Sequence, residues 1–168
     1  MINRILIIGS PGAGKSTLAR SLSQKLGLEI IHLDQYYWKE NWQESKRTDW
    51  EETIKKLIQK DQWIMDGNYG DTMDIRINRA DSIIYLDFPT RVTLFRIIKR
   101  IIKYHGKVRP DMPAGCKERF EFDFLHYVAI FRLTRKKGIL KKNTTLLKIE
   151  VFSINLKVIN TKQNDISR

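Results

Sequence analysis

The sequence predicts an α/β fold built on a parallel sheet, and three observations lead to that prediction. Short apolar, β-branched segments alternate along the chain with longer segments whose apolar residues recur at helical spacing. A glycine-rich loop joins the first such strand to the first helix. The 168 residues, of which 42% are hydrophobic and 30% charged, are enough for one domain with one sizeable core. Strands that alternate with helices in this way form parallel sheets with right-handed crossovers.

The strands are expected where short apolar segments are bounded by turn residues. We place them at residues 5–8, 28–33, 62–65 and 82–86, with a fifth at residues 149–153. The intervening helices are expected at residues 18–26, 48–60, 75–77, 90–104 and 118–137. Gly27 is expected to cap the first helix. The polar residues 160–168 are expected to fray.

Two of these helices carry more detailed expectations. Thr48 and Glu51 are three residues apart, which is the spacing of a capping box at a helix start. The expected apolar face of that helix consists of Trp50, Ile54, Leu57 and Ile58. The helix over residues 90–104 is basic and amphipathic. Its expected apolar stripe is Leu94, Phe95, Ile98, Ile101 and Ile102, and its opposite face is Arg96, Lys99, Arg100 and Lys103.

The loop after the first strand predicts a phosphate site. Residues 9–17 read Gly-Ser-Pro-Gly-Ala-Gly-Lys-Ser-Thr and match the pattern G-x-x-x-x-G-K-[ST] between a strand and a helix. Backbone N–H groups and the helix N-terminus attract an anion there. The residues expected to bind phosphate are Gly9, Gly12, Ala13, Gly14, Lys15, Ser16 and Thr17. We expect Lys15 to reach the β- and γ-phosphates and the Ser16 hydroxyl to hold Mg²⁺. This motif predicts a nucleoside triphosphate, which kinases, ATPases and GTPases all bind.

Three aspartates follow the other strands at the edge where a parallel sheet binds its ligands: Asp34, Asp66 and Asp87. Phosphoryl transfer needs one group to hold Mg²⁺ and another to orient the nucleophile. Asp66 suits the metal or its waters, and Asp34, beside a Tyr-Tyr-Trp cluster, suits a general base. The alternative for each is a loop-capping aspartate. Asp87 precedes Phe88-Pro89 and is expected to be a turn residue or N-cap.

Arginines that stabilise the transferring phosphoryl group are expected near a Pro/Gly loop over residues 105–120, which resembles a short lid. Arg100 and Arg109 are the main candidates, and Arg96, Arg119 and the pair Arg132 and Arg135 are further ones. The alternative is a solvated basic face. Arg76, just after the Asp66 loop, is placed to grip a phosphate on an acceptor.

Composition limits the remaining possibilities. The net charge of +12 fits a nucleic-acid surface, a site for polyanionic small molecules, or a solvated basic face. Cys116 is the single cysteine, and with no apparent signal peptide or membrane span it fits the reducing cytoplasm. His32 and His105 have no partners at zinc-ligand spacing, so no zinc site is expected. Nothing identifies Cys116 as a nucleophile.

Several segments together resemble a known family. Residues 9–17 resemble the phosphate loop of adenylate kinases, and residues 64–69 resemble their Asp-Gly segment. More closely, residues 3–135 resemble adenylate-kinase-related proteins labelled "DNA topology modulation proteins". The segments that carry this likeness are His32-Leu33-Asp34, Tyr37-Trp38, residues 63–69 and 81–89, Arg109-Pro110-Asp111-Met112, Gly115-Cys116 and Glu118-Arg119-Phe120.

The resemblance implies a P-loop NTPase three-layer sandwich, with five parallel strands, helices on both faces and a short lid. It implies ATP as donor, and the label suggests an influence on DNA topology. We expect the acceptor-binding residues to be Asp34, Tyr37, Asn68, Tyr69 and Arg76. Adenylate kinases carry Asp-Gly-Phe-Pro-Arg, where this chain has Asn68-Tyr69-Gly70 after Asp66-Gly67, so AMP is in doubt as acceptor. From about Lys141 the chain fits the family poorly.

We therefore expect one domain over residues 1–168, with a core at 1–90 and 140–159. Its expected function is ATP-dependent phosphoryl transfer, with Mg²⁺, to a small nucleotide or nucleoside. One rival function is that of an ATP-binding, DNA-topology-modulating protein that binds nucleic acid through its basic surface, although no helix-turn-helix, zinc finger or RNA motif is present. The other is an ATPase switch that needs no acceptor. The acceptor and the oligomeric state stay open, and no membrane partner is expected.

Overall fold

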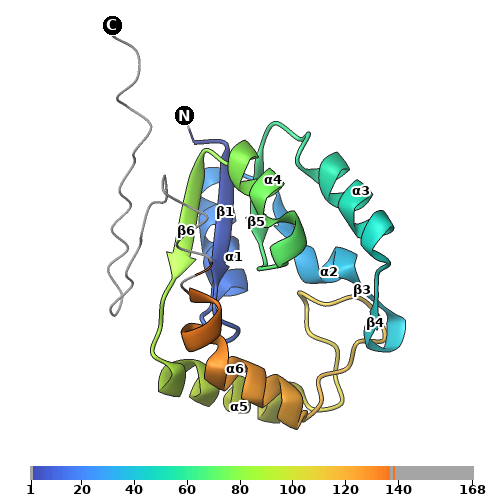
Figure 1. Ribbon diagram of the computed structural model, residues 1–168, viewed down its shortest axis with the longest axis vertical. Helices are drawn as coiled ribbons and strands as arrows, with labels where there is room; N and C mark the ends of the chain where they lie inside the picture. The colour runs from blue at the N-terminus through green and yellow to red at the C-terminus, as the bar shows by residue number, and fades with distance from the viewer. Residues whose placement is uncertain (1, 137, 139–168) are drawn as a thin grey trace, which may run out of the picture.

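The computed structural model describes residues 2–136 and 138. Its centre is a parallel sheet of four strands in the order β2-β5-β1-β6 (Figure 1). The strands are β1 Arg4–Gly9, β2 Ile30–His32, β5 Trp63–Asp66 and β6 Ser82–Leu86. A fifth strand was expected at residues 149–153, and these lie outside the described residues, as does the expected core segment 140–159. The α/β fold with a parallel sheet is confirmed.

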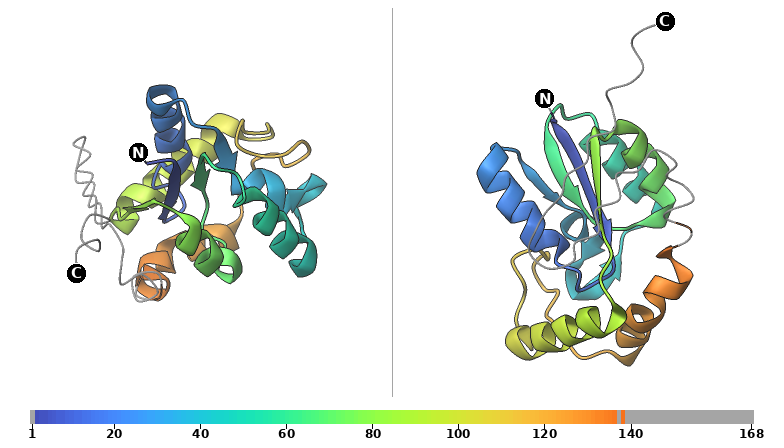
Figure 2. Two further views of the ribbon diagram at one scale, coloured as in Figure 1. Left: turned by 90° about the horizontal axis from the view of Figure 1, so that it is seen from above. Right: turned by 90° about the vertical axis from the view of Figure 1, so that its left-hand side faces the viewer.

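Helices cover both faces of this sheet, so the architecture has three layers (Figure 2). Alternate residues of β1 point to opposite faces, because side chains alternate along a strand. Ile5 and Ile7 pack with Ala19 of α1 (Lys15–Leu26) in one core. Leu6 and Ile8 pack in a second core, against α3 (Arg47–Leu57) and α4 (Met73–Arg79). Because both faces of the sheet are buried, the β1 segment Ile-Leu-Ile-Ile is apolar throughout.

Smaller elements continue the chain after β2 and β5. These are α2 Leu33–Tyr37, β3 Trp38–Lys39, η1 Glu40–Trp42, β4 Gln43–Glu44 and η2 Gly70–Thr72. Strands β3 and β4 pair as an antiparallel hairpin. The strand expected over 28–33 is therefore shorter than predicted, because the chain turns into α2 at Leu33, which is fully buried. No helix among residues 2–136 is both long and apolar enough to cross a bilayer.

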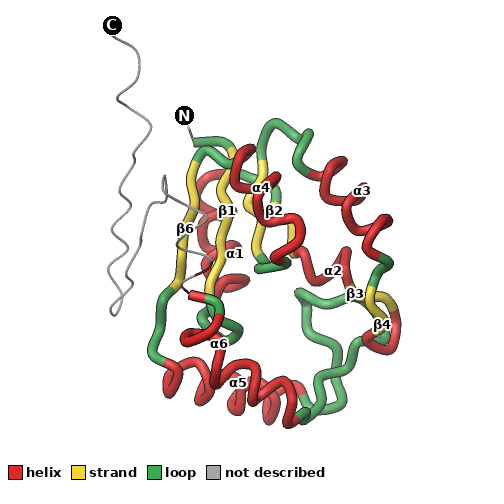
Figure 3. Tube along the Cα trace, in the orientation of Figure 1, coloured by secondary structure: helices red, strands yellow, loops and turns green. Residues whose placement is uncertain are grey.

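Two helices stand outside the layers and close one end of the molecule. Helix α5 (Thr90–Tyr104) packs against α6 (Phe122–Thr134) through Ile97, Ile101 and Val128. The loop of residues 105–121 joins them and runs back to the β3–β4 hairpin (Figure 3). Hydrogen bonds fasten it there: the Trp42 indole donates to the Lys117 carbonyl at 2.9 Å. The predicted lid is thus a loop docked on the hairpin.

Several sequence expectations hold and several do not. Strand β6 and helix α5 have their predicted bounds, and Gly27 caps α1 with a left-handed φ of 71°. The capping box is wrong, because α3 begins at Arg47 without a side-chain cap and the Thr48 hydroxyl donates to Asp49 instead. Helix α6 begins four residues later than the predicted 118.

The predicted apolar stripe of α5 is also wrong in most of its members. Thr93, Ile97 and Ile101 are the buried residues of α5, whereas Phe95 and Ile102 are 68% and 75% exposed. The buried face is rotated because Ile97 packs on the phosphate loop: a Cβ at Gly12 would lie 2.9 Å from its side chain. The spacing alone does not reveal that contact.

Candidate active site

The phosphate loop lies between β1 and α1, as the motif predicts. Gly12 has a φ of 77°, and a Cβ there would lie 2.6 Å from the Thr93 carbonyl oxygen of α5. At Gly9 a Cβ would lie 2.5 Å from the carbonyl oxygen of Leu86. Both positions therefore require glycine. Gly14 is the N-cap of α1, so the positive end of the helix dipole faces this loop.

Lys15 lies over the same loop. Its ammonium group donates to the carbonyls of Gly9 at 3.0 Å and Ser10 at 3.1 Å. Burial lowers the pKa of this lysine, and the charges of Asp66 and Asp34 oppose that shift. The lysine side chain therefore contacts the phosphate loop and interacts electrostatically with the two carboxylates that the sequence singles out.

Asn68 holds the phosphate loop from the neighbouring strand. Its side-chain oxygen accepts from the Gly9 N–H at 3.1 Å, and its amide donates to the Gly9 carbonyl at 2.9 Å. The sequence analysis assigned Asn68 to the acceptor. Both ends of its amide instead bind the peptide groups of Gly9, so its role in the structure is to position the loop.

Arg76 is the clearest correction among the predicted site residues. It is fully buried and donates to the carbonyls of Gly67 at 3.0 Å, Asn68 at 2.7 Å and Tyr69 at 2.6 Å. Its Nε donates to the Thr72 carbonyl at 3.1 Å. Burial lowers the pKa of its guanidinium. The prediction that Arg76 grips an acceptor phosphate is wrong, because its side chain holds the loop over residues 67–72 and is not exposed to a ligand.

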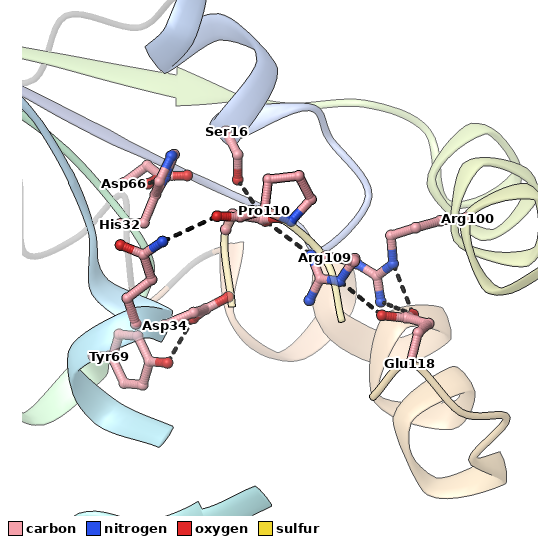
Figure 4. Close-up of polar contacts among 11 residues, drawn as sticks. Ser16, His32, Asp34, Asp66, Tyr69, Arg100, Arg109, Pro110 and Glu118 are labelled. Atoms are coloured by element: carbon pink, nitrogen blue, oxygen red, sulfur yellow. Dashed lines mark hydrogen bonds and ion pairs between the residues drawn. The ribbon is translucent and has the colours of Figure 1, made fainter. Parts of the chain in front are cut away.

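Asp66 ends β5 and pairs with His32 at the end of the adjacent β2. The Nδ1 atom of His32 lies 2.6 Å from an Asp66 carboxylate oxygen (Figure 4). Burial lowers the pKa of His32, but the hydrogen bond and the charge of Asp66 outweigh burial, so the net shift is upward. His32 is a site residue that the sequence analysis treated only as a possible metal ligand. Its position at the tip of a strand, like that of Asp66, was the available signal.

The predicted magnesium ligands are hard oxygen donors. The Ser16 hydroxyl donates to Asp111 at 3.2 Å, and the Asp66 carboxylate is 5% exposed. Magnesium keeps several waters and takes one or two carboxylates together with phosphate oxygens, so this donor set fits it. No group of three or more His, Cys, Asp or Glu residues within residues 2–136 forms a dedicated metal cage. Asp111 is a residue that the sequence analysis missed.

Asp34 faces the phosphate loop from α2. It lies in the first turn of this helix and not at a strand tip as predicted, because β2 ends at His32. The Tyr69 hydroxyl donates to its carboxylate at 2.6 Å. Burial raises the pKa of Asp34, and the Tyr69 hydrogen bond and Lys15 only partly offset that rise. A carboxylate with a raised pKa is a better proton acceptor for a hydroxyl group.

The two main arginine candidates share one buried carboxylate. Arg100 on α5 donates to Glu118 at 2.9 Å, and Arg109 in the 105–121 loop forms an ion pair with the other oxygen of Glu118 at 2.7 Å (Figure 4). Arg109 also donates to Asp111 at 2.8 Å, so a chain of contacts links Arg100 to Ser16 of the phosphate loop. Glu118 is 3% exposed and was missed, because only the folded loop places it between the two arginines.

The other predicted arginines lie at the edges of this network. Arg96 donates to the Ala13 carbonyl at 3.3 Å and lies over the Phe88 ring. Arg119 pairs with Glu121. Arg132 and Lys136 both pair with Asp87, which tethers α6 to the end of β6. Asp87 is thus structural as expected, although it is not an N-cap: Pro89 occupies that position.

A single cavity of about 1430 Å³ joins these groups. The phosphate loop lines one end, and Asp34 with a cluster of aromatic side chains lines the other. The rings of Tyr37, Trp50 and Tyr69 lie with centroids 4.5 to 5.2 Å apart. Tyr37 and Tyr69, both predicted acceptor residues, therefore share a wall with Asp34. The same cavity is thus lined both by the phosphate loop and by the residues expected to bind the acceptor.

The fold and the phosphate loop define a P-loop domain. A family model described as "AAA domain" matches residues 5–107, and the chain belongs to this family. It is also similar to the curated "Uncharacterized protein YqaC" of Bacillus subtilis (strain 168), at 27% identity over 139 residues, 78% of this chain and 74% of that protein. Neither description refers to DNA topology, so that label stays a prediction.

Solved structures of P-loop kinases share the fold. Shikimate kinase from Acinetobacter baumannii, in complex with shikimate, has a TM-score of 0.60 at 16% identity, over 92% of this chain and 86% of that one. A gluconokinase from Sinorhizobium meliloti 1021 has a TM-score of 0.53 at 15% identity, over 90% and 84% of the two chains. These likenesses establish the architecture of the chain.

Proposed function

We propose that this protein is a phosphotransferase that moves the γ-phosphate of ATP to the hydroxyl group of a small acceptor. The observation that carries the proposal is the cavity, which is lined together by the phosphate loop, Lys15 and Asp34. A hydrolytic switch needs only the phosphate loop and a water molecule. A second wall with a partly buried carboxylate and aromatic rings supports a second bound molecule.

In this proposal each group has one task. The backbone N–H groups of residues 9–17 and the Lys15 ammonium bind the triphosphate. Ser16 and Asp66 would hold Mg²⁺, which when bound neutralises charge on the phosphates. Asp34 accepts the proton of the acceptor hydroxyl. Arg100 and Arg109 stabilise negative charge on the transferred group and exclude water beneath the docked loop.

The comparisons support this proposal in a general way. The solved neighbours named shikimate kinase and gluconokinase have the same fold. Because a fold alone does not identify an acceptor, we propose a nucleotide or nucleoside as the first acceptor class to test, in a single-domain enzyme of the cytoplasm. The +12 charge is compatible with a nucleic-acid partner, but no described feature of the cavity requires one.

The test follows the γ-phosphate of labelled ATP in the presence of a panel of nucleotides, nucleosides and sugars. The proposal predicts label on an acceptor and loss of that transfer in Asp34→Asn. Asp49→Asn, an exposed aspartate of α3, is the matched control and should behave like wild type. Label that appears only as inorganic phosphate, at a rate no acceptor changes, would instead support the ATPase switch.

A further inference from the structure

The wall of the cavity that carries Asp34 contains no lysine or arginine among the described lining residues. This wall, here called the acceptor wall, is built from α2, the β3–β4 hairpin, the start of α3 and the loop after β5. Its cavity-lining residues are Asp34, Tyr37, Trp38, Trp42, Glu44, Trp50, Gly67, Asn68, Tyr69, Gly70, Asp71 and Met73. Three of these are carboxylates and five are aromatic, and none is lysine or arginine.

The lysines and arginines that line the cavity lie elsewhere, and three of them, Arg100, Arg109 and Arg119, form ion pairs. The lining lysines and arginines belong to the phosphate loop, α1, α5, the 105–121 loop and α6. Arg100 and Arg109 share Glu118, and Arg119, which lies 6.0 Å from the Trp42 ring centroid, pairs with Glu121. Arg76, the arginine nearest in sequence to this wall, is fully buried on backbone carbonyls. An anionic group at the acceptor wall would therefore meet carboxylates and π-faces, and no lysine or arginine that belongs to that wall.

The aromatic side chains of this wall are arranged to receive a flat or apolar face. Trp38 lies edge-on to Tyr37 at 5.1 Å and to Trp42 at 5.4 Å. The Tyr37 hydroxyl donates to Glu44 at 3.0 Å, and Glu44 is the strand partner of Trp38. Ring faces flanked by carboxylates attract neutral and positively charged groups and disfavour anions.

From these observations we infer that the acceptor carries no phosphate or carboxylate group. It is a neutral or amine-bearing alcohol, such as a nucleoside or an amino sugar, that stacks on the aromatic side chains and presents a hydroxyl to Asp34. This inference rests on the proposed function for the position of the acceptor. It narrows the acceptor from nucleotides to phosphate-free molecules.

The inference can be tested without knowing the acceptor, through collisional quenching of Trp38 fluorescence. Trp63 is fully buried and Trp50 is 3% exposed, so Trp38 and Trp42 are the accessible indoles. In the Trp42→Phe variant, Trp38 becomes the reporter. Acrylamide, iodide and caesium serve as neutral, anionic and cationic quenchers at constant ionic strength.

The overall charge of the protein and the local charge of the acceptor wall predict opposite orders of quenching by iodide and caesium. A protein of net charge +12 attracts iodide, whereas the acceptor wall attracts caesium. Relative to acrylamide, we expect caesium to quench Trp38 about threefold better than iodide, since local potentials reach a few kT. The added substitutions Glu44→Gln and Asp71→Asn should remove this preference. Stronger quenching by iodide in the Trp42→Phe background would overturn the inference.

The second part of the test compares ligands that differ only by a phosphate group. Quenching of Trp38 is measured with adenosine and with AMP, and with glucosamine and with glucosamine 6-phosphate, to find which ligand protects Trp38 from the quencher. The inference predicts that the phosphate-free member of a pair protects Trp38 at the lower concentration, and protection by the phosphorylated member first would contradict it. Where neither member of a pair protects Trp38, the relative quenching of Trp38 by caesium and iodide alone supports or overturns the inference. ATP binding measured on the same samples separates this inference from the proposed function: a protein that does not bind ATP fails the proposed function, whereas one that binds ATP but prefers iodide or the phosphorylated ligands fails this inference alone.

Discussion

Asn68 binds both peptide groups of Gly9, accepting from its N–H at 3.1 Å and donating to its carbonyl at 2.9 Å. A residue from the loop after β5 thus fixes the first glycine of the phosphate loop. Asn68→Ala removes both hydrogen bonds, and we expect it to cost about 1–3 kcal/mol in the free energy of unfolding. It should also weaken ATP binding, because the loop is no longer held in its binding conformation. Urea unfolding and calorimetric titration measure the two effects.

The matched control for this substitution is Asn78→Ala, on the exposed side of α4. It should leave ATP affinity and stability near their wild-type values. Unchanged ATP binding in Asn68→Ala would show that the contact with Gly9 does not organise the phosphate loop.

We expect substitution of Arg76 to affect mainly the stability of the folded protein and not catalysis directly. Arg76→Met keeps much of the buried volume but leaves the carbonyls of the 67–72 loop without their donor. Buried groups that lose their hydrogen bonds cost about 1–3 kcal/mol each, so we expect a loss of at least about 3 kcal/mol in urea unfolding. Arg79→Met removes a single hydrogen bond, to the Ile58 carbonyl, and should cost less. A fully stable Arg76→Met protein that fails only to bind acceptor would restore the phosphate-gripping role.

The pH dependence of turnover should report Asp34 as the base. Because burial raises its pKa, kcat/KM for the acceptor should fall as pH decreases, at a pH above the ordinary carboxyl value of about 3.9. The Tyr69 hydrogen bond lowers that pKa, so Tyr69→Phe should move the acid limb to higher pH. Tyr36→Phe, at an exposed position next to the site, should not. An acid limb that Tyr69→Phe leaves in place would argue against Asp34.

The His32–Asp66 pair should make stability depend on pH in a defined direction. The folded-state pKa of His32 is raised above its unfolded value of about 6.5. The stabilisation is therefore complete below pH 6.5 and is lost as pH rises through the folded pKa. Urea unfolding from pH 5.5 to 9 should show this loss in wild type and not in His32→Gln. A parallel pH profile of the two proteins would contradict the assignment.

The sequence predicts the parts of this molecule that depend on local pattern. The phosphate loop, β6 and α5 follow from short motifs and periodicity. What it does not predict depends on contacts between distant segments: Glu118 between two arginines, Asn68 on Gly9, and the four carbonyls around Arg76. The stripe of α5 was wrong for the same reason, since the contact of Ile97 with Gly12 determines which face is buried. Asp111 and His32 lie in segments that resemble the known family, but the residues that they contact are evident only in the folded structure.

The most direct measurement of the central claim is calorimetric and thermal-shift titration of wild type and Lys15→Ala with Mg-ATP. Wild type should bind, and ATP at 100 times its Kd should add about 2.7 kcal/mol to the free energy of unfolding. Lys15→Ala should lose this stabilisation, whereas Lys25→Ala, at an exposed position of the same helix, should keep it. Absence of any response of wild type to ATP, or an equal response of Lys15→Ala, would contradict the assignment of residues 9–17 as the donor site.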